Sequence, residues 1–224
     1  MMDISALLNV EKGVTALIGG GGKTTLMYTL AEELRRRGTV LVTTSTHIQR
    51  PEQYPVLTAA DDTVVAAALA AHGVVCVADE SPEGKLCAPA LSFERLAALA
   101  DFVLVEADGS RRLPLKAHAP HEPVIPPNAR QTIYVVGADG FGHPIRKICH
   151  RPERYAALCG ATEDDIVTPA REAAVLHAEG YDTGWVFINK VETPEDWRSA
   201  EALAALLPGK AVAGSLWEKR YRIL

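Results

Sequence analysis

The chain has 224 residues, of which 48% are hydrophobic and 23% are charged, and its formal net charge is −5. This composition suits a folded globular domain, and the negative charge argues against binding nucleic acid, which needs a basic face. No apolar stretch reaches the roughly 20 residues of a membrane helix, and the first ten residues lack the basic start of a signal peptide. We therefore expect a cytoplasmic protein that contacts neither nucleic acid nor membrane.

Short apolar stretches alternate with longer amphipathic segments, which is typical of a parallel sheet covered by helices. The predicted strands are rich in Val, Ile and Leu, and they span residues 13–18, 39–44, 74–78, 102–106, 132–137, 185–189 and 211–213. The predicted helices span residues 23–37, 61–72, 93–100, 152–159, 170–179 and 194–206. We expect residues 1–224 to form one three-layer α/β domain with a mostly parallel central sheet and an ordered, proline-rich excursion at about 112–128.

A glycine-rich segment lies between the first predicted strand and the first predicted helix, and it reads Gly19-Gly20-Gly21-Gly22-Lys23-Thr24-Thr25. Glycines let backbone N–H groups converge on phosphates, and the helix N-terminus adds partial positive charge. In such loops the lysine contacts the β- and γ-phosphates and the next hydroxyl binds Mg²⁺, which are the roles expected of Lys23 and Thr24. The segment predicts a P-loop NTPase fold that binds a nucleoside triphosphate with Mg²⁺.

The loop departs from the common patterns at two positions. The full phosphate-loop pattern has a glycine where this chain has Leu17. The remaining core resembles the variant loop of partitioning and metallocentre-maturation NTPases, which carry a lysine where this chain has Ile18. A lysine that acts across a dimer from this position is therefore not expected.

The predicted strand at 102–106 ends in carboxylates, Glu106 and Asp108. In P-loop enzymes a carboxylate at such a strand end holds Mg²⁺ or its water. We expect Asp108 to bind Mg²⁺ or to sense the γ-phosphate, and Glu106 to order water or metal, so that both act with Lys23 in catalysis. The alternative is an acidic turn that merely closes a strand.

Several histidine, lysine and arginine side chains follow other strand ends or lie in the excursion. His47 ends the second strand, where it can face the γ-phosphate or a substrate, although a lone histidine is more often structural. Arg111, Arg112 and Lys116 are candidates for holding an anionic second substrate, or they are simply solvated. Arg151 is a candidate for clamping an anionic ligand, or it simply stabilises packing.

The strand at 185–189 runs into Asn189-Lys190-Val191-Glu192. Guanine-specific P-loop proteins use Asn-Lys-x-Asp here, with the aspartate accepting hydrogen bonds from guanine. Glu192 offers the same carboxylate one methylene further out, so Asn189, Lys190 and Glu192 favour GTP over ATP. The alternative is that Glu192 only starts the next helix and Asn189 only ends a strand.

These motifs occur in one order with four further segments, Thr43–His47, Leu113–Lys116, Glu122–Pro126 and His150–Glu153. In this combination nearly the whole chain resembles the selenium-dependent hydroxylase accessory proteins, the YqeC-like family. The resemblance implies a role in maturing molybdenum hydroxylases that carry labile selenium, with such a hydroxylase or its maturation machinery as partner.

The favoured hypothesis from the sequence is a slow Mg²⁺-dependent NTPase, using GTP rather than ATP, that drives a partner-dependent step of cofactor insertion. One alternative is a small-molecule kinase or nucleotidyl-transfer enzyme that holds an acceptor with Arg111, Lys116 and Arg151. Another is a non-enzymatic, nucleotide-gated binding module in which residues 111–128 move.

Overall fold

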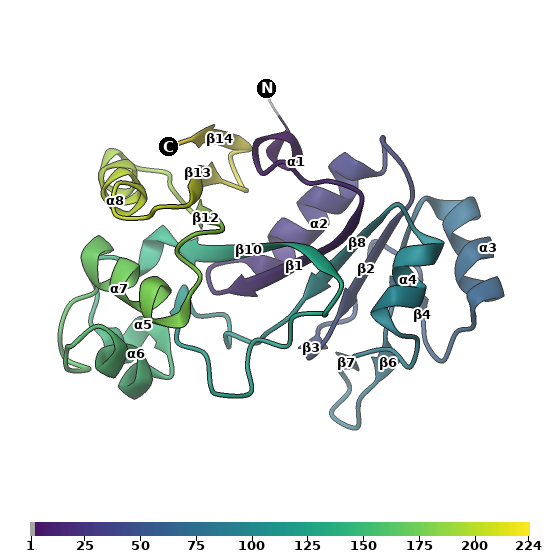
Figure 1. The fold of residues 1–224 in the computed structure, drawn as a ribbon, viewed down its shortest axis with the longest axis horizontal. Helices are drawn as coiled ribbons and strands as arrows, with labels where there is room; N and C mark the ends of the chain where they lie inside the picture. The colour runs from purple at the N-terminus through teal and green to yellow at the C-terminus, as the bar shows by residue number, and fades with distance from the viewer. Residues whose placement is uncertain (1–2) are drawn as a thin grey trace.

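The computed structural model describes residues 3–224, and its centre is a nine-stranded sheet (Figure 1). The strands are β1 (Gly13–Gly19), β2 (Val40–Thr44), β4 (Val56–Leu57), β5 (Val74–Val77), β8 (Phe102–Glu106), β10 (Ala129–Gly137), β12 (Trp185–Asn189), β13 (Lys210–Ser215) and β14 (Arg220–Ile223). Their order is β14-β13-β12-β10-β1-β8-β2-β5-β4. Neighbours pair in parallel, but β13 and β14 are antiparallel. The predicted α/β class with a mostly parallel sheet is confirmed.

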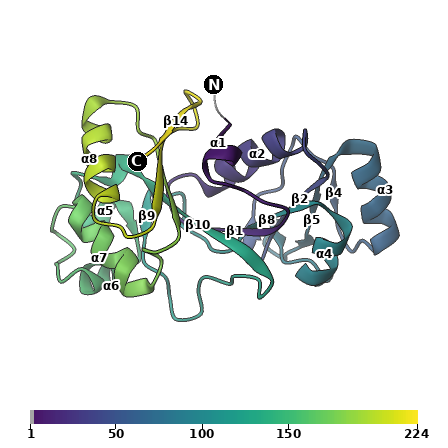
Figure 2. The ribbon, with the colours of Figure 1, turned by 45° about the horizontal axis from the view of Figure 1, so that its top comes forward.

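Helices cover both faces of this sheet (Figures 1 and 2). One face packs against α1 (Ile4–Leu7) and α2 (Lys23–Leu34). The other face packs against α3 (Asp62–His72) and α4 (Phe93–Leu99) at one end, and against α5 (Ile145–Ile148), α6 (Pro152–Leu158), α7 (Pro169–Glu179) and α8 (Pro194–Ala204) at the other. Strand residues alternate between the faces: Leu17 packs with the α2 side, and Ile18 with the α7 side. The molecule therefore has three layers.

Each predicted strand and helix is present, with ends that differ by a few residues. Three helices start where expected because Ser92, Thr168 and Thr193 accept backbone N–H bonds as N-caps. The structure adds short elements that the sequence analysis did not predict. β4 lies inside the stretch between β2 and α3 and pairs with β5, and β14 adds an antiparallel edge strand beside β13.

Two small sheets stand beside the carboxyl ends of the central strands. One consists of β3 (His47–Ile48), β7 (Leu86–Cys87) and β6 (Asp79–Glu80), and the other pairs β9 (Leu115–Lys116) with β11 (Cys149–His150). A 3-10 turn, η1 (Ala138–Gly140), follows β10. β9 belongs to the proline-rich excursion, whose residues 114–118 are all buried. The excursion is thus built into the molecule next to the phosphate loop.

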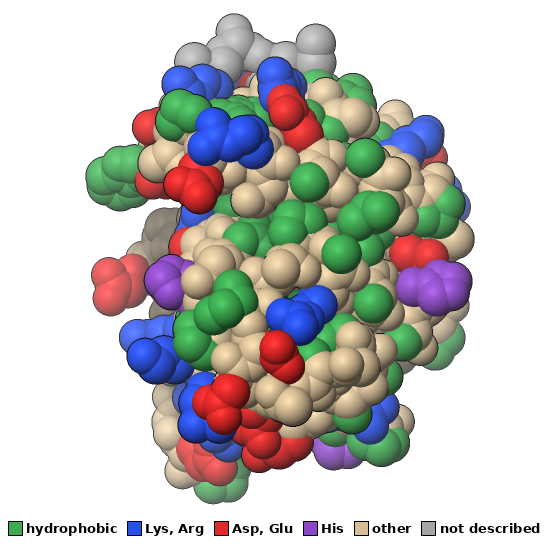
Figure 3. All heavy atoms as spheres, turned by 90° about the vertical axis from the view of Figure 1, so that its left-hand side faces the viewer, with side chains coloured by type: hydrophobic (Ala, Val, Ile, Leu, Met, Phe, Trp, Pro, Cys, Tyr) green, Lys and Arg blue, Asp and Glu red, His purple; other side chains and the backbone are tan. Residues whose placement is uncertain are grey.

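No helix within residues 3–224 has both the length and the apolar character needed to cross a bilayer. The face that lies over α6, α7 and α8 carries acidic and basic side chains interspersed with apolar ones (Figure 3). The four cysteines form no disulfide within the described chain.

Candidate functional site

The glycine loop is held tightly at the carboxyl edge of the sheet, between the end of β1 and the start of α2. Gly21 has a φ of +70°, and a Cβ there would lie 2.3 Å from the backbone N of Gly137. Gly22, with a φ of +116°, is the N-cap of α2. Only glycine fits these positions without strain. The loop therefore presents the first backbone N–H groups of α2, which have no acceptor within the helix, in one fixed orientation.

Lys23 folds back over this loop and is only 3% exposed. Its Nζ donates to the carbonyl oxygen of Gly19 at 2.6 Å and lies 3.0 Å from Oδ1 of Asp108 and 4.0 Å from Oε1 of Glu106. The three side chains that the sequence analysis named as catalytic thus meet at one point.

Glu106, the last residue of β8, is the carboxylate nearest to Thr24. The Thr24 hydroxyl donates to Oε2 of Glu106 at 2.7 Å. Burial raises the pKa of Glu106, and the opposing effects of Lys23 and of the Thr24 hydrogen bond offset this only in part. The structure therefore places Glu106, and not Asp108 as expected, beside the hydroxyl predicted to bind Mg²⁺.

Asp108 is fully buried and surrounded by donors. Its Oδ2 accepts from the backbone N of Gly19 at 2.9 Å, and it lies 2.6 Å from Nε2 of His118 and 3.0 Å from Nζ of Lys116. Its Oδ1 has no hydrogen-bond partner within residues 3–224 apart from the nearby ammonium of Lys23. Burial alone would raise the pKa of Asp108, but Lys23, His118 and Lys116 together lower it well below its usual range. Asp108 is a permanently charged centre of this network.

His118 and Glu179, which the sequence analysis did not assign to the site, continue the network to the end of α7. Nδ1 of His118 lies 2.6 Å from Oε2 of Glu179, and its backbone N donates to Oε1 at 2.7 Å. Each ring nitrogen faces a carboxylate, an arrangement that favours the doubly protonated imidazolium. Burial lowers the pKa of His118, but the hydrogen bonds to Asp108 and Glu179 have the larger effect, so that the pKa is raised overall. The phosphate loop is thereby linked to α7.

Lys116 and Arg151, expected to hold a second substrate, are occupied by protein groups. Lys116 is 0% exposed, and its Nζ donates to the carbonyl oxygen of Gly109 at 2.8 Å and to Oε2 of Glu122 at 2.9 Å. Arg151 donates to the same Oε2 at 2.7 Å. Burial would raise the pKa of Glu122, but the two cations lower it to about 2. These pairs hold the proline-rich excursion in place.

A cleft of about 890 Å³ opens over the phosphate loop. Its lining follows the order of the central strands. The lysines and arginines that line it are Lys190 after β12, Lys23 after β1, Arg111 and Arg112 after β8, and Lys85 between β6 and β7, and His47 after β2 lines it too. The cleft therefore contains the predicted residues His47, Arg111 and Arg112, together with Lys85, which the sequence analysis did not single out.

Arg111 and Arg112 form the corner of a tight turn on the rim of this cleft. The backbone N of Leu113 donates to the carbonyl oxygen of Ser110 at 2.9 Å, and the two arginines have φ values of 51° and 64°. Such corners normally take Gly, Asn or Asp, because an L side chain costs on the order of 1 kcal/mol per residue there. The carbonyl oxygen of Leu113 accepts from the backbone N of Gly21 at 3.1 Å, which attaches the turn to the phosphate loop.

The predicted base-reading segment lies on the other side of the loop. Asn189 donates through Nδ2 to the carbonyl oxygen of Gly21 at 2.8 Å, and its Oδ1 accepts from the backbone N of Leu216 at 3.2 Å. Oε1 of Glu192 accepts from the hydroxyl of Ser215 at 2.8 Å. The segment after β12 is thus tied both to the phosphate loop and to the turn after β13.

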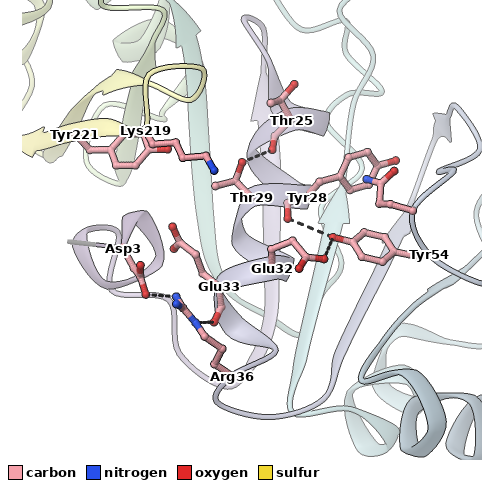
Figure 4. A pocket seen from close by; sticks show the side chains of 11 residues that line it. Asp3, Thr25, Tyr28, Thr29, Glu32, Glu33, Arg36, Tyr54, Lys219 and Tyr221 are labelled. Atoms are coloured by element: carbon pink, nitrogen blue, oxygen red, sulfur yellow. Dashed lines mark hydrogen bonds and ion pairs between the residues drawn. The ribbon is translucent and has the colours of Figure 1, made fainter. Parts of the chain in front are cut away.

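A second cavity of about 670 Å³ runs along the outer face of α2 (Figure 4). Its other walls come from Asp3 at the start of α1, from the stretch before β4, and from the β13–β14 turn with β14. The hydroxyl of Tyr54 donates to Oε1 of Glu32 at 2.8 Å and so connects the wall to the helix. Thr25 lines both cavities, so the second cavity adjoins the phosphate loop.

The amino-acid sequence matches a known protein family and one of its relatives. The YqeC protein family matches residues 15–153. The chain is 35% identical over 179 residues to the uncharacterized protein YqeC of Escherichia coli (strain K12). The aligned region covers 73% of this chain and 69% of that protein. The protein belongs to the YqeC family.

The region matched by the YqeC family contains most of the site. It includes the phosphate loop, both carboxylates after β8, the Arg111–Arg112 turn and Arg151, and it ends before Glu179 and the base-reading segment.

Among solved structures, the signal recognition particle 54 kDa protein from Aeropyrum pernix K1, in complex with GDP, has a TM-score of 0.45 and 14% sequence identity. The match covers 96% of this chain and 44% of that one, so the chain spans less than half of that protein's length.

Proposed function

We propose that this YqeC family member binds a nucleoside triphosphate with Mg²⁺ at the Gly19–Gly22 loop and hydrolyses it slowly, with GTP preferred over ATP. The observation that carries the proposal is the convergence of Lys23, Thr24 and two buried carboxylates at the N-terminus of α2. A buried lysine between carboxylates, next to the first N–H groups of α2, which have no acceptor within the helix, is the arrangement that a polyphosphate with a cation would complete.

The oxygen atoms at this point fit Mg²⁺, which prefers carboxylate, hydroxyl and phosphate oxygens. Thr24 and Glu106 would hold the ion, in place of the Thr24–Asp108 pair expected from the sequence. No group of three or more His, Cys, Asp or Glu residues within residues 3–224 is arranged to hold a metal by itself, so the triphosphate and water would supply the remaining ligands. The bound ion would neutralise the phosphate oxygens as charge shifts toward the leaving group.

The chain's own residues would divide the remaining work. Lys23 would exchange the Gly19 carbonyl and Asp108 for phosphate oxygens. Asp108 would keep Lys116, His118 and the backbone N of Gly19, so its charge would stay balanced when Lys23 turns away. Glu106, which would hold the ion together with Thr24, would also orient the attacking water beside it.

Base recognition would fall to the segment after β12. Asn189 already fixes that segment against Gly21, and the exposed carboxylate of Glu192 would accept the N–H groups of guanine. Together with the implied role in maturing selenium-dependent molybdenum hydroxylases, this supports a cytoplasmic GTPase that serves a partner-dependent step of cofactor insertion.

The test is calorimetric titration of the protein with GTP, ATP and their non-hydrolysable analogues in the presence of Mg²⁺. Lys23→Ala should abolish measurable binding, because it removes the buried ammonium that faces the phosphates. Lys147→Ala, which alters an exposed lysine of α5, is the matched control and should bind as the wild type does. Undiminished binding by Lys23→Ala would refute the proposal, and equal affinity for GTP and ATP would remove its guanine part.

A further inference from the structure

The order of the central strands gives the cleft two distinct ends. The base-reading segment follows β12, on one side of the phosphate loop after β1. The Arg111–Arg112 turn follows β8, on the opposite side, and His47 after β2 lies further in the same direction. A nucleotide whose base lies at the β12 side would direct its γ-phosphate toward the β8 side. The arginines would then lie beyond the γ-phosphate, where the nucleotide itself ends.

This far end has walls of its own. Away from the phosphate loop, the cleft is lined by Thr46–Gln49, by Glu83 and Lys85 of the β6–β7 hairpin, and by the Arg111–Arg112 turn and His150. The cleft therefore has room for a small molecule next to a bound triphosphate.

The far end of the cleft carries positive charge on arginine side chains that are not paired with protein groups in the described part of the chain. Within residues 3–224 the guanidinium groups of Arg111 and Arg112 make no ion pair or hydrogen bond, in contrast to Lys116 and Arg151 behind them. Of the acidic residues that line this end, Glu122 is already shared by those two buried cations, and Glu83 is an exposed residue of the hairpin beside Lys85. The two arginines thus remain free to bind an anion from solution.

The pKa of His150, which lines the cleft together with the two arginines, reflects the positive charge around it. Its pKa is lowered to about 4, first by burial and then by the positive charges of Arg151, Lys116 and Arg111, while Glu122 acts in the opposite direction. A neutral histidine in this place leaves the arginines as the charged groups of the wall.

The backbone of the two arginines is fixed at this rim. Both corners of the turn are in the left-handed region that favours glycine, yet both are arginine. The turn is tied to the phosphate loop through the bond from the backbone N of Gly21 to the carbonyl of Leu113. The arginines are therefore placed relative to the γ-phosphate position by the loop itself.

We propose that the far end of the cleft is a binding site for a second ligand that carries a phosphate group, held by Arg111 and Arg112 next to the γ-phosphate of the nucleotide. Two adjacent guanidinium groups match the double charge of a phosphate monoester better than the single charge of a carboxylate, and their planar forks fit phosphate oxygens. The inference rests on the proposed nucleotide binding and adds a second substrate class to it.

The test uses inorganic phosphate as the probe. Wild-type protein is saturated with Mg²⁺ and a non-hydrolysable GTP analogue, whose binding is measured first by calorimetry, and phosphate is then titrated and followed by ³¹P NMR line broadening. We expect saturable binding that the double variant Arg111→Gln/Arg112→Gln weakens by at least about tenfold. Arg146→Gln, which alters an exposed arginine paired with Asp164, is the control and should leave phosphate binding unchanged.

The other outcomes overturn the inference in different ways. Absence of phosphate binding to the wild-type complex, or equal binding by the double variant, would rule out the site. A double variant that instead loses affinity for the analogue would assign the arginines to the γ-phosphate. Failure of the wild type to bind the analogue at all would be a failure of the proposed function, seen in the calorimetry before phosphate is added. The thermal unfolding midpoint of each variant shows whether it is folded.

Discussion

The charged side chains beneath the phosphate loop are buried and paired, whereas Arg111 and Arg112 on the rim of the cleft are exposed and unpaired within residues 3–224. Beneath the loop, Lys23, Asp108, Lys116 and His118 are nearly inaccessible to solvent, and each of them contacts an opposite charge. On the rim, the Arg111–Arg112 turn is exposed, and its guanidinium groups have no partner among residues 3–224. A buried charge without a partner is costly, so the inner group must be complete within the protein. The outer group can stay incomplete, because water solvates it until a ligand arrives.

The largest expected effect comes from removing the centre of the inner group. Asp108→Asn would leave Lys23, Lys116 and His118 buried around a neutral amide, and we expect unfolding to become easier by about 3–5 kcal/mol. Urea unfolding at neutral pH measures this loss. Asp164→Asn, which alters an exposed ion pair with Arg146, should cost less than about 1 kcal/mol. Similar small losses in both variants would mean that the buried network contributes little.

The contrast between these regions also explains what the sequence could predict. The strand at Phe102–Glu106 is apolar up to its last residue, and burial on both faces of a sheet requires that pattern locally. β14 could not be predicted in this way, because Arg220 and Arg222 are exposed on an edge strand whose position depends on pairing with β13. The two residues of β4 form too short an apolar segment to stand out from a loop.

The site shows the same limit. Lys23 and Thr24 could be predicted because the phosphate loop is local in sequence. The relative placement of Glu106 and Asp108 could not, since β8 ends at Glu106 and strand alternation no longer fixes the direction of Asp108. The bond between His118 and Glu179 joins the excursion to the end of α7, and no local pattern announces it. The ion pair between Lys116 and Glu122 could not be predicted either, because it forms only when the excursion is folded.

A smaller effect is expected where the inner group approaches the surface. Glu122→Gln would leave Lys116 and Arg151 without their shared carboxylate, and we expect a loss of about 1–3 kcal/mol in the free energy of unfolding. Because this carboxylate fixes the excursion, limited proteolysis of the folded variant should show faster cleavage within residues 117–128. Glu153→Gln, an exposed residue of α6, is the control. An unchanged cleavage rate would show that other contacts hold the excursion.

The protonated ring of His118 makes part of the inner group dependent on pH. Its pKa is raised in the folded protein, so its contribution is complete below the ordinary histidine pKa of about 6.5 and is lost as pH rises through the raised value. Each unit of that shift corresponds to about 1.4 kcal/mol. His118→Gln should therefore lose most stability relative to wild type at about pH 6 and less at alkaline pH. Urea unfolding over this range tests the sign, with the exposed His121→Gln as control; a difference that grows with pH would contradict the imidazolium.

The smallest effect, and the one that separates the two regions most directly, is expected at the rim. Arg111→Gly should relieve a left-handed φ, and because glycine loses more chain entropy on folding, the net gain in stability should be at most about 1 kcal/mol. The same change should weaken phosphate binding at the far end of the cleft, since it removes one of the two free guanidinium groups. Urea unfolding and the phosphate titration together measure both quantities on one variant. A rise in stability together with weaker phosphate binding would show that arginine at this position serves ligand binding at a cost in stability. A fall in stability would mean that the arginine side chain stabilises the turn, so that no ligand is needed to explain its position on the rim.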